Sequence, residues 1–383
     1  MDKIGIVTGY HIINYGSALQ AFATQKYLDD KNIPNECIHY EKKNSISQIL
    51  RVFNKPLLKA KMATIKKGQY AKKHYDTFGK YLEMRNKKFK EFVQEKFRLS
   101  DTYTGYENLK KATKNYNAFL LGSDQVWNPM NFGSHYYTLE FVPDNILKIA
   151  YAPSFGVSKI PKNQVERTKK FLNRIEYISV REKKGQELIK ELTGRDVPVV
   201  VDPTLLLTLE QWQTIYPKER IVKDKYILCY FLGTNSSHRE FAKKLQEITG
   251  YKIITLPHMD EIVPGDFTFG ESLFDIGPKE FLNLIANAEY VCTDSFHGTV
   301  FSVLHHKKFF TFSRYAENKK DSTNSRLTSL LGILGIEDRL YTAKEDPKNE
   351  YEKEINYKEV DENLQKIREE SKKYLDNALS KIK

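Results

Sequence analysis

The chain has 383 residues, of which 40% are hydrophobic and 29% charged, and its formal net charge is +12. This length exceeds one typical hydrophobic core, so we expect two domains. The sequence has no apolar run long enough to span a membrane and starts with a strand pattern rather than a secretion signal, which predicts a cytoplasmic protein. The three cysteines are too few for a disulfide scaffold, and we expect them to be reduced.

Short apolar runs alternate with helical patterns, which indicates an α/β chain with mostly parallel strands. The first series of expected strands is KIGIVTGY, NECIHY, AFLLGS, LKIAYAPSF, YISVRE and VPVVVDPTLLL; the second is YILCYFLG, YKIITLP, YVCTDS and KFFTFS. We therefore expect an N-terminal α/β domain over residues 1–205 and a C-terminal α/β domain over 206–345. A polar helical tail, 346–383, is expected to pack back on the first domain.

The positive charge is concentrated in one segment, residues 42–114, which we interpret as a basic insertion in the first domain. It holds 20 lysine and arginine residues against six acidic ones, whereas the rest of the chain holds 41 against 43. The segment is typical of a basic amphipathic helix able to lie on anionic lipid or bind an anionic partner. Alternatively, its apolar stripe packs on its own domain and the lysines are solvated. The stripe comprises Ile46, Ile49, Leu50, Phe53 and Leu57.

Polar residues directly after the first strand form the first candidate cluster, because open parallel sheets bind ligands beyond the carboxyl ends of their strands. His11, Asn14 and Gly16 stand there, just before a helical pattern. A glycine permits close backbone approach, and a helix N-terminus attracts anions. The spacing from Gly9 to Gly16 does not fit a dinucleotide-binding fingerprint. A plain turn with a helix cap is the structural alternative.

The second cluster is GSDQVWN, with Ser123, Asp124, Gln125, Trp127 and Asn128 after an apolar strand. A carboxylate, an amide and an indole together suit the binding and deprotonation of a polyol such as a sugar. The alternative is that the aspartate only caps a helix and the tryptophan belongs to the core.

Arg181 ends another expected strand, in YISVRE. Its guanidinium suits bidentate binding of a carboxylate or phosphate. An Arg–Glu pair at a helix start is also a frequent structural feature.

The last cluster, TDSFHG, stands where a late strand meets a helical pattern, and it includes Asp294, Ser295 and His297. An imidazole beside a bound phosphate stays protonated and acts as a general acid. A histidine that only satisfies hydrogen bonds at a helix start is the alternative reading.

Other chemistries lack sequence support. There is no CxxC, HExxH or G-x-S-x-G motif, so we expect no metal site and no lipase-type nucleophile. The lysine-rich segment matches no nucleic-acid-binding motif, and we expect no nucleic-acid partner.

Taken together, NYGSALQA, GSDQVWN, SVRE, VDPTLLL and TDSFHG resemble the polysaccharide pyruvyl transferase family over about residues 3–315. The resemblance implies two Rossmann-like domains similar to the glycosyltransferase B architecture, with the active site in the cleft between them. It also implies transfer of a pyruvyl group from phosphoenolpyruvate to two hydroxyls of one sugar, which forms a cyclic ketal, releases phosphate and needs no cofactor.

Roles for individual residues follow from the same resemblance. His297 is the general acid, and Asp124 serves the acceptor side as the first candidate for the base, with His11 second. The expected donor-binding residues are Arg181, Ser295, Phe296, Gly298 with the N–H groups around it, and Thr299. The expected acceptor or cleft residues are His11, Asn14, Gly16, Ser123, Gln125, Trp127, Asn128 and Asp294.

The resemblance also suggests the partner molecules. Acceptors in this family are lipid-linked repeat-unit sugars or capsular and cell-wall glycans, so an acceptor linked to polyprenyl diphosphate and peripheral contact with the inner, anionic membrane face are expected. Two alternatives stay open: a nucleotide-sugar glycosyltransferase on the same fold, and a carbohydrate-binding or membrane-docking protein without activity.

Overall fold

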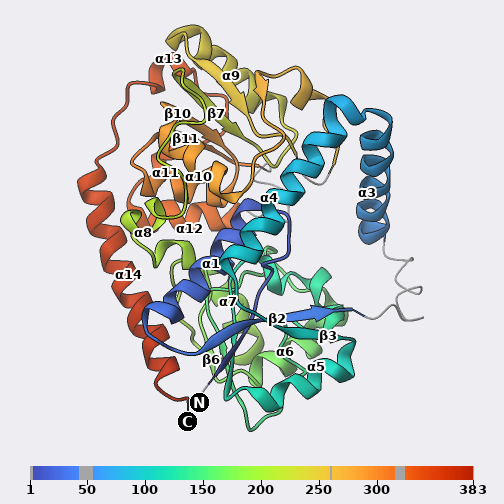
Figure 1. Ribbon diagram of the computed structural model, residues 1–383. Helices are drawn as coiled ribbons and strands as arrows, with labels where there is room; N and C mark the ends of the chain where they lie inside the picture. Colours follow the sequence, from blue (N-terminus) through green and yellow to red (C-terminus); the bar gives the residue numbers. More distant parts are fainter. Residues whose placement is uncertain (1–2, 43–54, 259–260, 315–323, 383) are drawn as a thin grey trace.

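Two parallel sheets organise the chain, as Figure 1 shows for a computed structural model that describes residues 3–42, 55–258, 261–314 and 324–382. The strand orders are β3-β2-β1-β4-β5-β6 and β12-β11-β10-β7-β8-β9. Each sheet starts at its centre, grows outward in one direction, and then restarts beside the first strand to grow in the other. The two halves therefore share one doubly wound topology, with switch points between β1 and β4 and between β7 and β10.

The first sheet uses five of the six expected strand regions and adds an edge strand that was not expected. Its strands are β1 (Ile4–Val7), β2 (Asn35–Glu41), β3 (Leu99–Thr104), β4 (Ala118–Leu121), β5 (Leu147–Ala150) and β6 (Tyr177–Ile178). The edge strand β3 is polar and mostly exposed, so it lacks an apolar run that would reveal it.

The strand expected in VPVVVDPTLLL is absent, and that prediction was wrong. Only an isolated bridge between Val180 and Val199 forms there, followed by a 3₁₀ turn at Pro203–Leu205. Prolines 198 and 203 lack the N–H group that a ladder requires.

Helices cover the first sheet and the connection from β2 to β3. They are α1 (Tyr15–Asp30), α3 (Lys55–Lys73), α4 (Lys80–Lys96), α5 (Tyr106–Ala112), α6 (Val165–Asn173) and α7 (Lys183–Thr193), with a π-helical turn at Tyr75–Gly79. Because β3 and α5 fall within residues 42–114, this basic segment contributes a strand to the sheet.

The second half contains all four strands expected for it. Its strands are β7 (Tyr226–Tyr230), β8 (Lys252–Thr255), β9 (Glu271–Ser272), β10 (Tyr290–Thr293), β11 (Lys308–Phe312) and β12 (Leu340–Tyr341). Its helices, with the short α8 before β7, are α8 (Leu209–Gln213), α9 (Ser236–Thr249), α10 (Pro278–Asn287), α11 (Phe296–Leu304), α12 (Ser325–Leu334) and α13 (Pro347–Glu350).

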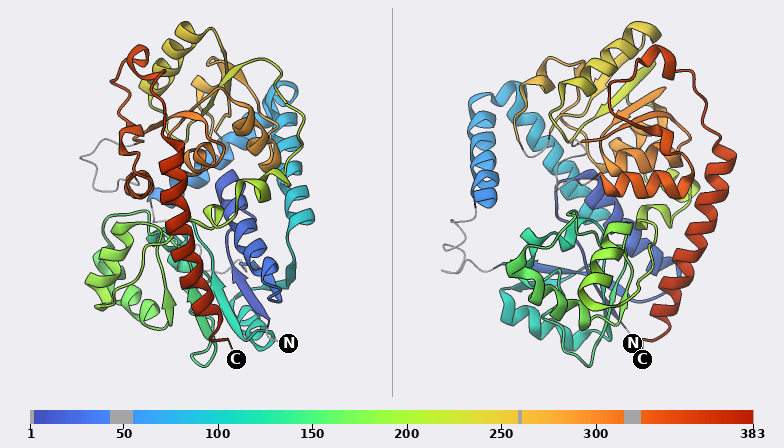
Figure 2. Two further views of the ribbon diagram at one scale, coloured as in Figure 1. Left: turned by 90° about the vertical axis from the view of Figure 1, so that its left-hand side faces the viewer. Right: turned by 180° about the vertical axis from the view of Figure 1, so that it is seen from behind.

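Aromatic packing and a long C-terminal helix hold the halves together. Tyr15 of α1 stacks on Phe281 of α10 with ring centroids 4.5 Å apart, and its hydroxyl donates to the Ile276 carbonyl. The helix α14 (Tyr357–Leu379) runs along both halves in Figure 2, and the Ser371 hydroxyl accepts a hydrogen bond from the Val201 amide. The orientation of the two switch points is thereby fixed. The domain boundaries at 205/206 and 345/346 stay predictions.

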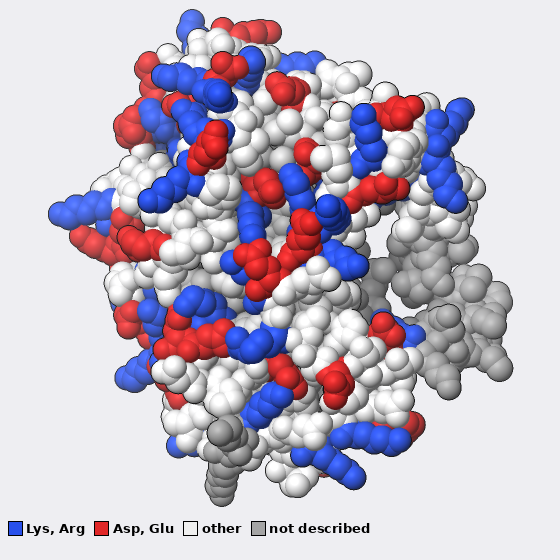
Figure 3. Space-filling view, in the orientation of Figure 1, with Lys and Arg blue, Asp and Glu red and all other residues white. Residues whose placement is uncertain are grey.

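The membrane hypothesis remains open. Residues 46, 49, 50 and 53 of the predicted stripe lie outside the described residues, and Leu57 lies in α3. Helix α3 stands apart from the sheets in Figure 1, with Met62 and Ile65 exposed. In the part of the chain that the structure describes, no helix is both long and apolar enough to span a membrane. The face in Figure 3 mixes basic and acidic side chains.

Candidate active site

A cavity of about 420 Å³ lies between the two halves, beyond the carboxyl ends of β4 and β10. Both strands adjoin the switch points, which is where open α/β sheets bind ligands. The first half contributes Asn14, Ser17, Asp124 and Gln125 among the lining residues, and the second half Ser295, Phe296, His297, Arg314 and Arg326. A larger hollow of about 510 Å³ lies between α4 and α10, but its two lysines are paired with Glu280 and Glu95.

His297 enters the cavity from the first turn of α11. Ser295 caps this helix through its hydroxyl, which accepts from the Gly298 amide at 3.3 Å. That amide is therefore occupied by the helix cap, and binding of an anion by the N–H groups around Gly298 stays a prediction. Thr299 is also turned away, because its hydroxyl donates to the Ser295 carbonyl and pairs with Thr311. Ser295 and Phe296 line the cavity, and their role in donor binding stays a prediction.

Gly16 makes room for the histidine. A Cβ atom at this position of α1 would lie 1.9 Å from Nδ1 of His297, far inside van der Waals contact. Any other residue at position 16 would displace the imidazole. The sequence predicted a close approach to a ligand here, and the structure shows a close approach to a side chain of the other half.

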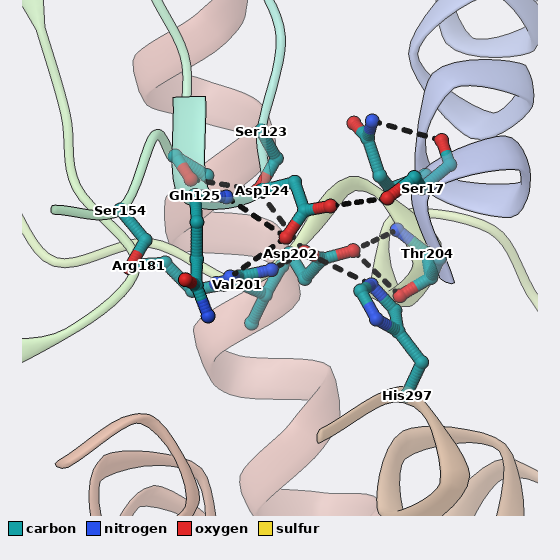
Figure 4. A network of polar contacts seen from close by, with 12 residues as sticks. Ser17, Ser123, Asp124, Gln125, Ser154, Arg181, Val201, Asp202, Thr204 and His297 are labelled. Carbon is teal, nitrogen blue, oxygen red and sulfur yellow. Dashed lines mark hydrogen bonds and ion pairs between the residues drawn. The ribbon is translucent and has the colours of Figure 1, made fainter. Parts of the chain in front are cut away.

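Asp202 joins the histidine to Arg181, as Figure 4 shows. Its Oδ2 lies 2.5 Å from Nη1 of Arg181 and 3.6 Å from Nε2 of His297. The Ser123 hydroxyl lies 3.0 Å from the same oxygen and 2.7 Å from the Ala152 carbonyl and has one proton for the two acceptors. The amide and hydroxyl of Thr204 donate to Oδ1. Burial raises the pKa of Asp202, but His297 and Arg181 outweigh it and hold the pKa well below its ordinary range. The motif VDPTLLL contains this aspartate, but the sequence alone predicts no role for it.

Asp124 presents a carboxylate to the cavity. Its Oδ2 accepts from the Ser17 hydroxyl at 2.5 Å and its Oδ1 from the Gln125 amide at 2.8 Å, with Nη2 of Arg181 3.7 Å away. Burial raises the pKa, yet Arg181 and His297 lower it further, so the carboxylate is ionised at neutral pH. Its backbone has φ of 77°, a strained conformation that non-glycine residues adopt mostly at functional sites.

Two arginines that sequence reasoning missed line the opposite wall. Arg314 donates to the Asp294 carbonyl at 2.9 Å, and Arg326 donates to Gln125 once the amide is oriented with its oxygen toward the guanidinium. The Nε atoms of both arginines are buried and have no hydrogen-bond partner among the described residues. Burial, together with Arg181 and Arg314, lowers the pKa of Arg326 to about 10. No recognised motif in the sequence singled out either arginine.

Arg181, the predicted donor anchor, is buried behind this wall. It does not line the cavity, and its guanidinium stacks on the Phe296 ring with 4.4 Å to the centroid. Direct binding of the donor by this side chain stays a prediction that the geometry does not support, whereas Arg314 and Arg326 face the cavity.

Several predicted cleft residues serve the fold instead. Trp127 is fully buried, donates to the Tyr137 carbonyl and packs on Phe155, so the predicted sugar platform was wrong. Asn128 caps a 3₁₀ turn. Ser123 is buried against Asp202.

The two remaining predicted residues also lie away from the ligand space. Asp294 is buried, and its carboxylate accepts from the amides of Leu232 and Gly233. His11 is exposed and does not line the cavity. Asp124 is therefore the remaining candidate for the general base. Among the described residues, no group of three potential metal ligands occurs.

A model of the polysaccharide pyruvyl transferase family matches residues 14–315, and the chain belongs to this family of polysaccharide-directed transferases. No curated protein matches it by sequence.

Solved structures share its two-domain fold. The structure of UDP-N-acetylglucosamine 2-epimerase from Rickettsia bellii has a TM-score of 0.52 and 13% identity, covering 100% of this chain and 97% of that one. E. coli ADP-heptose lps heptosyltransferase II has a TM-score of 0.41 and 11% identity, covering 97% and 100%. The predicted α/β architecture of two Rossmann-like domains, similar to glycosyltransferase B enzymes, is confirmed.

Proposed function

We propose that the protein transfers a pyruvyl group from phosphoenolpyruvate to two hydroxyls of a sugar in a surface or capsular polysaccharide or its lipid-linked precursor, forming a pyruvate ketal and releasing phosphate. Family membership supports the reaction class. The observation that supports the donor is a pair of arginines, Arg314 and Arg326. Their buried Nε atoms lack partners among the described residues, and both side chains line a cavity shared with His297 and Asp124.

The arginine wall suits the donor's charge. Phosphoenolpyruvate carries a carboxylate and a phosphate, both of which guanidinium groups bind through charge-assisted hydrogen bonds. An excess of buried positive charge, which burial and neighbouring arginines make unfavourable in Arg326, is relieved when such an anion binds. A small dianion or trianion fits this wall better than a neutral molecule does.

The facing side chains supply proton transfer. His297 protonates the methylene carbon of the donor, which leaves positive charge on C2. A sugar hydroxyl attacks C2 and gives its proton to Asp124, forming the first C–O bond. The second hydroxyl forms the other C–O bond as the C2–O(phosphate) bond breaks, its proton returns to His297, and Asp124 releases its proton to the leaving phosphate. Proton donors and acceptors of this kind contribute about 10²- to 10⁴-fold each.

A nucleotide-sugar glycosyltransferase is the competing function, because one fold hosts both chemistries. The enzyme is therefore incubated with phosphoenolpyruvate and a panel of lipid-linked or free glycan acceptors, and phosphate release is measured together with the mass of the product. We expect phosphate release that depends on the acceptor, with a pyruvyl ketal on the sugar. Release of a nucleotide from a sugar nucleotide, without use of phosphoenolpyruvate, would overturn the proposal.

His297→Ala tests the role of the histidine. Loss of a general acid predicts a fall in kcat of about a hundredfold or more. His306→Ala is the matched control, because His306 lies outside the cavity lining and is paired with Asp361 at 3.0 Å. Equal activity of the two variants contradicts the assignment.

A further inference from the structure

The imidazole of His297 has two nitrogens in different surroundings. Nε2 is buried and faces Oδ2 of Asp202 at 3.6 Å, just beyond hydrogen-bonding distance, and has no hydrogen-bond partner among the residues described. Nδ1 lies against Gly16, and the ring fills the volume that a Cβ atom would take at this position. Only one nitrogen of a neutral imidazole carries a proton, so these surroundings decide which nitrogen meets a ligand.

We propose that Asp202 is a positioning residue that holds the Nε2–H side of His297, so that Nδ1, beside Gly16, exchanges the proton with the substrate. This inference rests on the proposed function of the cavity. It assigns Asp202 a role in the reaction that acts through the histidine rather than through contact with the substrate.

The contacts of Asp202 favour this role over a purely structural one. Arg181 donates to Oδ2 and Thr204 donates twice to Oδ1, so the carboxylate is fixed in orientation. These three donors already satisfy it without the histidine. The side chain of His297 nevertheless ends beside it with a buried nitrogen that lacks a partner in the described part of the chain. A buried unpaired polar atom is unfavourable, and a small shift on ligand binding would pair it.

Arg181 keeps this carboxylate ionised. Its Nη1 lies 2.5 Å from Oδ2, and both side chains are almost completely buried. The sequence predicted that Arg181 binds the donor directly. In the structure it contacts Asp202, which in turn orients His297. A carboxylate behind a catalytic histidine selects its tautomer and its ring orientation in the same way in hydrolase triads.

Gly16 contacts the other side of the His297 ring. It lies in the first turn of α1, and within a helix alanine is more favourable than glycine. The 1.9 Å approach to Nδ1 explains why glycine is required. An alanine would push the ring away from its place beside Asp202.

Nitrogen-15 NMR of the full-length protein with labelled histidine tests the inference directly. The resonances of His297 are assigned by their loss in His297→Ala, and spectra are recorded at a pH where the ring is neutral. We expect the proton on Nε2 in the wild-type protein and a mixed or reversed tautomer in Asp202→Asn. A wild-type ring protonated on Nδ1 overturns the inference, whichever donor the enzyme uses. The measurement needs no turnover, so its failure is distinct from failure of the proposed function.

Kinetics provide the second readout. With phosphoenolpyruvate as donor, Asp202→Asn should lower kcat by about a hundredfold while KM changes by less than about threefold, because orientation of the acid is lost and donor contacts are kept. Ser123→Ala, which removes a different contact to the same oxygen, should retain the wild-type tautomer and most of kcat. Unchanged kcat and tautomer in Asp202→Asn would show that the residue serves only the fold.

Gly16→Ala keeps the test usable if Asp202→Asn fails to fold. The added methyl group should displace the ring and lower kcat by about a hundredfold. Gly68→Ala is its matched control, because nothing lies within 4 Å of a Cβ at that helical position. Full activity of Gly16→Ala would contradict the claim that the reaction needs the ring in its place between Gly16 and Asp202.

Discussion

Two buried arginines flank the ring of Phe296, and their surroundings differ. Arg181 lies 4.4 Å from the ring centroid and is paired with Asp202, with Asp124 close by. Burial lowers its pKa, but these carboxylates outweigh burial and raise the pKa above the ordinary value. Arg326 lies 6.0 Å from the same ring, and no described carboxylate is within ion-pair distance. Burial and two neighbouring arginines lower its pKa to about 10.

The difference separates a cation that belongs to an internal network from one that we propose binds the donor. Arg181 neutralises carboxylates of the first half. Arg326 brings positive charge to the cavity from the second half without a described counter-ion, whereas Arg314 beside it is paired with Asp294 at 3.5 Å. A buried charge without its partner is unfavourable for folding, so its presence indicates a ligand that supplies the opposite charge.

Unfolding free energies give the largest expected contrast. Arg181→Gln leaves Asp202 buried without its main partner and should lower the free energy of unfolding by about 3–5 kcal/mol. Arg326→Gln removes an uncompensated cation and should change it by less than about 1 kcal/mol, or increase it. Urea unfolding of both variants at neutral pH, without added anions, measures the difference. Equal decreases in the free energy of unfolding would contradict the proposed difference between the two arginines.

For ligand binding, we expect the substitution of Arg326 to have a larger effect than the substitution of Arg181. Phosphoenolpyruvate or inorganic phosphate is expected to raise the unfolding temperature of the wild-type protein, because each binds the native state only. Arg326→Gln should lose about 1.5–3 kcal/mol of binding free energy, the worth of hydrogen bonds to a charged group. Arg326→Lys keeps the charge but not the planar fork, so an intermediate affinity is expected. Calorimetric titration of the three proteins provides the numbers, and wild-type affinity in Arg326→Gln would place the anion elsewhere.

Sequence reasoning found the site through strand ends but could not assign every residue there. Asp124 and Asp294 both follow an apolar central strand, one in each sheet. Asp124 keeps a carboxylate at the cavity, whereas Asp294 is occupied by two amides that precede α9. No local pattern separates them, because the amides of Leu232 and Gly233 come from a distant part of the chain.

The missed and misassigned residues have the same cause. Arg314 and Arg326 become a pair only when the second sheet and α12 are folded, and Asp202 meets His297 only when the halves pack together. Trp127 was misassigned for a related reason. Its polar neighbours in the sequence suggested a sugar-binding platform, but its ring is buried in the core. Strand positions follow from hydrophobic runs, but the partners of buried charges follow from tertiary contacts.

The smallest expected effect concerns the ring between the two arginines. In a double-mutant cycle, Phe296→Leu and Arg181→Gln should show a coupling of about 1 kcal/mol, because the guanidinium lies over the ring at 4.4 Å in a desolvated site. The cycle with Arg326→Gln should give less than about 0.5 kcal/mol, since at 6.0 Å the attraction is near its limit. Both cycles share the Phe296→Leu protein, so its loss of core packing cancels in each. A stronger coupling to Arg326 than to Arg181 would mean that the Phe296 ring stabilises Arg326. The ring, and not a bound anion, would then offset the free-energy cost of burying the Arg326 charge without a carboxylate partner.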